Sequence, residues 1–106
     1  MELKVQHEYR VQLQPLVDRY GTGKEIYSGL QVVEVGVRGF DGKLIEGEKS
    51  LQLVTYDEVE RYTTCDGSIV EVLDIYDDGR VELRDVYDQS VFTLDRDDAE
   101  IALVEP

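Results

Sequence analysis

Aspartate-glycine dipeptides separate short runs of apolar and β-branched residues along this chain of 106 residues, and this pattern most constrains its fold. Asp41-Gly42, Asp66-Gly67 and Asp78-Gly79 each divide two such runs. Asp-Gly favours tight turns between antiparallel strands because glycine adopts positive φ without strain, and the first of these dipeptides suits a type I′ turn. The other two predict consecutive hairpins, that is, a meander.

Nearly complete alternation of apolar and polar residues over positions 3–13 predicts a half-buried strand. At about 3.3 Å per residue it would span roughly 36 Å, so it must bend, serve two sheets or reach a neighbouring chain. Pro15 ends this strand because proline has no N–H to donate. Further β runs are expected at residues 30–38, 43–46, 51–56, 61–65, 68–76, 81–86, 91–94 and 101–104.

The helical content is expected to be small. The acidic segment at residues 95–100 is predicted to form one helical turn, in α or 3₁₀ form, before the final strand. Residues 55–58 fit a helix capping box, so a short helix competes with a strand over residues 56–62. The predicted fold class is therefore all-β: a small antiparallel barrel or sandwich of about seven to eight short strands, forming a single β domain over residues 1–106. By fold analogy alone, five short strands with a helical turn before the last suit an SH3-like barrel.

The negative charge of the chain is concentrated in its second half. Residues 1–53 carry eight acidic and seven basic side chains, whereas residues 54–106 carry sixteen acidic and four basic ones. The net charge is therefore −1 on the first half and −12 on the second, giving the total of −13. Such a field repels nucleic acids and anionic membranes and attracts basic protein surfaces.

Tyrosines accompany this charge, because four of the seven tyrosines lie after position 53. A tyrosine offers a large rigid surface, and its ring face attracts Arg and Lys, although β-sheets favour tyrosine for packing reasons as well. A carboxylate beside such a ring would contact the same basic group. The candidate partner-binding residues are Asp74, Tyr76, Asp77, Asp78, Asp85, Tyr87, Asp88, Asp95, Asp97 and Asp98.

Residues that suit catalysis or metal binding are few. His7, the only histidine, lies on the apolar side of the first predicted strand, where a packed strand residue is the usual finding. Cys65 has no neighbouring base to stabilise a thiolate. The loop at residues 21–24 lacks the phosphate-binding spacing, and the aspartate clusters do not fit a calcium-binding loop. We therefore expect no enzyme activity, no metal and no cofactor.

Two functions fit these observations. The first is a non-enzymatic acidic protein that docks its negative face on a basic, nucleic-acid-binding protein, as an inhibitor or nucleic-acid mimic would, without direct binding to nucleic acid or membrane. The second is a structural or assembly subunit, a homo-oligomer included, which uses the long N-terminal strand. The chain has a single cysteine and no long apolar stretch, so we expect a cytoplasmic location.

Overall fold

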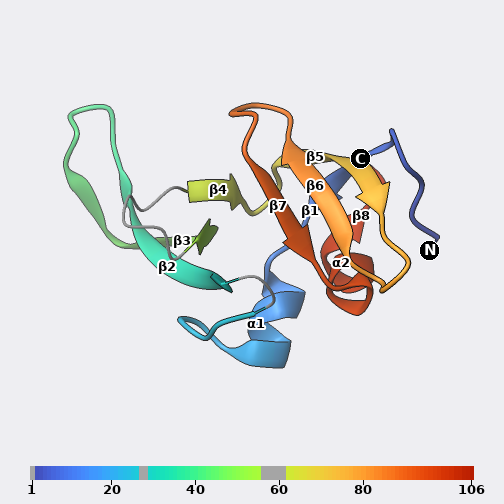
Figure 1. Cartoon of the computed structure of the whole chain (residues 1–106). Coiled ribbons are helices and arrows are strands. Elements are labelled where there is room, and N and C mark those ends of the chain that lie inside the picture. The colour runs from blue at the N-terminus through green and yellow to red at the C-terminus, as the bar shows by residue number, and fades with distance from the viewer. Residues whose placement is uncertain (1, 27–28, 56–61) are drawn as a thin grey trace.

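The computed structural model describes residues 2–26, 29–55 and 62–106. Within these residues the chain is mostly β, with eight strands in two sheets and two short helices (Figure 1). In chain order the elements are β1 (Glu8–Val11), α1 (Gln14–Tyr20), β2 (Leu30–Arg38), β3 (Leu44–Thr55), β4 (Tyr62–Cys65), β5 (Ile69–Ile75), β6 (Val81–Asp85), β7 (Val91–Leu94), α2 (Arg96–Ala102) and β8 (Leu103–Val104).

The larger sheet contains five antiparallel strands in the order β7-β6-β5-β1-β8. Strand β1 lies inside this sheet, since Tyr9 pairs with Val70 of β5 and Val11 pairs with Leu103 of β8. The helix α2 precedes β8, as expected for the acidic segment, but it is a seven-residue α-helix rather than a single turn. In the described residues β7 and β8 are edge strands that do not pair with each other, so the sheet is open and does not close into a barrel.

The long N-terminal strand predicted over residues 3–13 is wrong. The structure has a turn at Val5 and Gln6, and Gln6 adopts a positive φ of 61° that interrupts the extended backbone. Val5 is therefore exposed, and only Glu8–Val11 forms β1. At the other end Pro15 lies in the first turn of the helix α1, where proline is tolerated because its missing N–H needs no partner.

The Asp-Gly dipeptides make turns, but only two of the three make hairpins. Gly42 and Gly79 each adopt positive φ after a turn closed by a hydrogen bond from the glycine N–H to the carbonyl three residues earlier. The preceding aspartates keep negative φ, so neither turn is type I′. Asp66-Gly67 instead connects β4 of one sheet to β5 of the other, which contradicts the predicted meander.

The smaller sheet has the order β2-β3-β4, and its long β2–β3 hairpin projects from the rest of the molecule (Figure 1). The β runs predicted at residues 43–46 and 51–56 belong to one strand, β3. One residue of β2 lies opposite four residues of β3 between the pairs Gly36–Lys49 and Arg38–Leu44, which makes a large bulge. Residues 56–61, where helix and strand compete in the sequence, lie outside the described residues, and Tyr62 begins β4.

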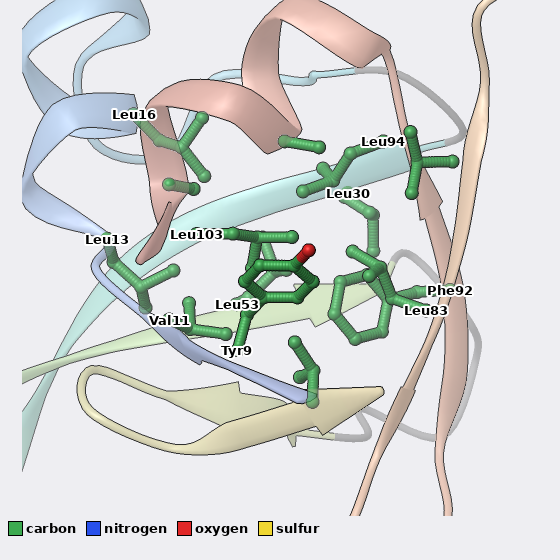
Figure 2. Packing of buried hydrophobic residues seen from close by; sticks show 14 of the residues in the cluster. Tyr9, Val11, Leu13, Leu16, Leu30, Leu53, Leu83, Phe92, Leu94 and Leu103 are labelled. Atoms are coloured by element: carbon green, nitrogen blue, oxygen red, sulfur yellow. The ribbon is translucent and has the colours of Figure 1, made fainter. Parts of the chain in front are cut away.

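One hydrophobic core joins the two sheets and both helices. Tyr9 is fully buried at its centre (Figure 2). Its hydroxyl accepts a hydrogen bond from the backbone N–H of Lys4 at 2.9 Å. The side chains around it come from β2, β3, β6, β7 and β8, and this contact surface is what fixes the larger sheet against the smaller one. They include Leu30, Leu53, Leu83, Phe92 and Leu103.

Candidate functional site

The turn between β5 and β6 and the start of α2 bring acidic side chains together at one end of the larger sheet. Asp78 and Gly79 of the turn and Asp95, Arg96 and Asp97 of the helix start line a hollow of about 350 Å³. Its three carboxylate residues are all exposed. Carboxylates 17 and 19 positions apart in the sequence therefore share one surface hollow.

Further carboxylates lie close in the sequence to the residues that line this hollow. Asp74, the penultimate residue of the strand β5, is exposed, Asp77 is exposed in the same turn as Asp78, and Glu100 lies one helical turn after Arg96. We call the group the acidic end; it consists of Asp74, Asp77, Asp78, Asp95, Asp97 and Glu100. Two guanidinium groups accompany these six carboxylates, those of Arg80 and Arg96, so four negative charges remain in excess.

Both arginines are engaged with residues of the acidic end. Arg80 Nε lies 2.8 Å from Asp78 Oδ2, and Arg96 Nε lies 3.2 Å from Glu100 Oε1. The guanidinium of Arg80 also stands 5.0 Å from the centre of the Tyr76 ring, in a cation–π arrangement. The cation–π contact that the sequence predicts for Tyr76 is therefore made within the chain.

The hydroxyl of Tyr76 is used within the fold as well. It donates a hydrogen bond to Glu82 Oε2 at 2.9 Å, and this bond raises the pKa of the Tyr76 phenol, with burial adding to the shift. Tyr76 thus ties the turn to β6 and holds Arg80. Its role at the acidic end is to position a neighbouring base.

Tyr87 and Asp88 lie at the opposite end of the same sheet, in the turn that follows β6. The Tyr87 side chain is 96% exposed and borders two hollows, one of about 270 Å³ with Cys65 and Asp88 and one of about 500 Å³ with Ile69 and Val86. Because β6 separates this turn from the acidic end, the structure does not bring the ten candidate residues onto one patch.

Two of the candidate residues are buried. Asp85 is 3% exposed, and its Oδ1 accepts hydrogen bonds from the backbone N–H groups of Tyr87 and Asp88 at 2.8 and 3.2 Å. Asp98 is 1% exposed and accepts hydrogen bonds from Arg19 and Tyr20 of α1. These carboxylates shape a turn and join two helices, so they are not available to a partner.

The residues that the sequence offers for catalysis or phosphate binding have structural contacts in the fold. The His7 ring is partly exposed and lies 3.1 Å from the Glu105 carboxylate. Burial raises the pKa of the Cys65 thiol, and Asp85 and Asp88 add to that shift against a hydrogen bond with Gln52, so the thiol form is favoured. The N–H of Gly23 donates to the Val32 carbonyl, which removes it from any phosphate cradle.

Among the residues that the structure describes, no three His, Cys, Asp or Glu side chains are arranged to hold a metal ion. Within the same residues, neither helix has the length and apolar character needed to cross a membrane. Comparisons of the chain with protein-family models, with curated proteins and with solved structures find no match.

Proposed function

We propose that this protein is a non-enzymatic acidic binding protein that docks its acidic end on the basic surface of another protein. The observation that carries the proposal is the hollow shared by Asp78, Asp95 and Asp97, because two separate elements converge there with carboxylates in excess over bases. A concave anionic surface attracts convex basic groups such as Lys and Arg side chains. As part of the proposal we place the protein in the cytoplasm, where its single cysteine stays reduced.

The partner class in this proposal is a protein that holds nucleic acid. Duplex DNA carries one charge per about 1.7 Å of its axis. The acidic end gathers six carboxylates against two guanidinium groups, so its surface has the sign of a phosphate backbone at a lower charge density. A groove that binds phosphates would accept this surface in place of DNA, and the protein would then act as a competitive inhibitor.

An assembly role through the N-terminal strand finds little support in this fold. Strand β1 is four residues long, and both of its edges are paired, with β5 on one side and β8 on the other. A strand in the interior of a sheet has no free backbone groups to offer to another protomer. The acidic end, by contrast, is exposed to solvent.

The experiment compares two variants that change the net charge equally. The first carries Asp77→Asn, Asp78→Asn, Asp95→Asn and Asp97→Asn, which neutralises the acidic end. The control carries Gln at four exposed glutamates of the first half, namely Glu8, Glu25, Glu46 and Glu48. Each protein is immobilised and used to capture proteins from a cell extract, with elution by a salt gradient and by a short DNA duplex.

We expect the unaltered protein and the control to retain a nucleic-acid-binding protein that the DNA duplex displaces, and the acidic-end variant to lose it. Attraction between charged surfaces weakens with salt, so elution should occur at moderate ionic strength. Equal retention by the acidic-end variant would show that these four carboxylates do not form the docking surface.

A further inference from the structure

The projecting part of β2 has a free edge. Near its start the edge is occupied, because Gly23 N–H donates to the Val32 carbonyl at 2.8 Å and Ile26 N–H donates to the Leu30 carbonyl at 2.6 Å. Beyond Val32, none of the described residues pairs with this side of the strand. The turn at residues 39–42 limits the edge at its other end.

The outward backbone groups of this edge follow from the pairing at its start. In an antiparallel strand the N–H and C=O of one residue point to the same side, and the side alternates from residue to residue. The Val32 carbonyl points away from β3, so the backbone groups of Glu34, Gly36 and Arg38 point the same way. These three residues form a set that is symmetric about Gly36.

We propose that a second copy of this chain pairs with this edge, antiparallel and with the two-fold axis at Gly36. In that register Gly36 exchanges two hydrogen bonds with Gly36 of the second copy, and Glu34 lies opposite Arg38 of the second copy. The symmetry repeats the Glu34–Arg38 pair on the other side of the axis. Two cross-strand charge pairs and a row of backbone hydrogen bonds therefore join the copies.

The side chains fit this register on both faces. Glu34 and Arg38 are exposed, and Arg38 uses one of its five donors for the Gly42 carbonyl at 2.7 Å. Gly36 has no side chain of its own, and the Leu44 side chain of β3 lies over it, between the two charge pairs. On the opposite face Val33, Val35 and Val37 are only partly buried, and the pairing sets Val35 beside Val37 of the second copy. The two valine rows then form one apolar strip.

The charge distribution favours a second copy at this place. Residues 34–49 carry four acidic and three basic side chains, a balance of −1, so the other residues hold −12 of the total of −13. Two copies that met through the acidic end would repel each other strongly. The projecting hairpin is where they can approach with little repulsion, and it holds the strongly acidic parts apart.

Charge-reversal variants test the register. Glu34→Arg places Arg opposite Arg38, and Arg38→Glu places Glu opposite Glu34, so each variant alone has two repulsive pairs in the dimer. An equimolar mixture of the two variants has only attractive pairs, as has the double variant Glu34→Arg/Arg38→Glu. The control Lys43→Glu changes an exposed residue of the same hairpin by the same charge as Arg38→Glu, away from the edge.

Mass is measured by sedimentation equilibrium from ~10 µM to ~1 mM, because an edge of five residues is short compared with a standard interface of about 1,600 Å² and should dissociate on dilution. We expect the wild type, the control, the mixture and the double variant to dimerise. Each single edge variant should have a dissociation constant at least about tenfold higher, since two charge pairs change sign. Exchange of the Gly36 amide hydrogen should slow as the wild-type concentration rises.

Three results would overturn the proposal. The first is a wild-type chain that stays monomeric over the whole concentration range. That result would include the case in which the edge pairs with a strand of another protein instead of a second copy. The second is a dimer that both single variants leave as strong as Lys43→Glu does, which would locate the interface elsewhere. The third is a mixture of the two variants that dissociates as readily as each variant alone, which would reject the Glu34–Arg38 register.

Discussion

Replacing Asp98 by alanine should destabilise the fold more than any other change of an acidic residue in α2. Asp98 is 1% exposed, and its carboxylate accepts hydrogen bonds from the Tyr20 hydroxyl at 2.8 and 2.9 Å and from Arg19 Nη1 at 3.0 Å. These contacts join α1 to α2 across residues far apart in the sequence. The side chain is thus the polar link between the two helices.

The magnitude follows from the number and kind of bonds. A hydrogen bond to a charged group contributes about 1.5–3 kcal/mol, and the alanine variant also leaves the Tyr20 hydroxyl without its acceptor. We therefore expect the free energy of unfolding to fall by about 3 kcal/mol, a large share of the roughly 5–15 kcal/mol typical of a domain. Asp98→Asn keeps an oxygen that accepts from Tyr20, so its loss should be about half as large.

Urea unfolding followed by far-ultraviolet circular dichroism measures these losses, with Asp97→Ala as the exposed control from the same helical turn. A cycle of Asp98→Ala, Tyr20→Phe and the double variant isolates the bond between the two residues. We expect a coupling free energy of about 1.5 kcal/mol. Our account of the helix pair would be wrong if Asp98→Ala cost no more than Asp97→Ala, or if the two changes were additive.

Three further predictions concern groups whose environment the structure defines. Burial, and then the hydrogen bond to Asp98, raise the pKa of the Tyr20 phenol above its ordinary value of 10.0. The hydroxyl therefore contributes its full share of the free energy of unfolding below about pH 10, and this share is lost as the pH rises through the folded-state pKa. Urea titrations should show that the free energy of unfolding falls more steeply at alkaline pH in the wild type than in Tyr20→Phe. Asp85→Ala should lower the free energy of unfolding by about 1–3 kcal/mol, because two backbone N–H groups lose their acceptor. Asp85→Asn should retain most of this free energy. Equal urea midpoints for the two variants would show that these hydrogen bonds do not stabilise the turn. Burial raises the pKa of the Cys65 thiol, so iodoacetamide at pH 8 should alkylate it more slowly in the folded protein than in urea, and equal rates would show that the thiol is not shielded.

The strands could largely be read from the sequence because their periodicity is local. The run at residues 91–94 is found as β7 with the same bounds, and the run at residues 30–38 is found as β2. The helix α1 also had a local signal, since Leu13, Leu16, Val17 and Tyr20 have helical spacing and a proline lies in the first helical turn. The alternation over residues 3–13 made this signal hard to recognise, because Leu13 fits both the strand pattern before it and the helical pattern after it.

The sheet to which each strand belongs could not be read in the same way. Asp66-Gly67 has the composition of a hairpin turn, yet the Gly67 N–H donates to the Val11 carbonyl and Asp66 Oδ1 accepts from the Leu13 N–H. These contacts with a distant segment turn the chain from one sheet into the other. The burial of Asp85 and Asp98 was hidden for the same reason, since an aspartate in an acidic stretch resembles its exposed neighbours until its long-range partners are known.

The position of β1 in the larger sheet determines when this protein can fold. Tyr9 pairs with Val70, 61 positions later, and Arg10 pairs with Val104, 94 positions later. At about 5–20 residues per second, a ribosome needs roughly 5–19 s to supply the second of these neighbours. Pairings of such long range also slow folding itself, to milliseconds or longer. Strand β1 therefore leaves the ribosome long before the strands that flank it, and until they follow, Tyr9 and Val11 remain accessible to chaperones.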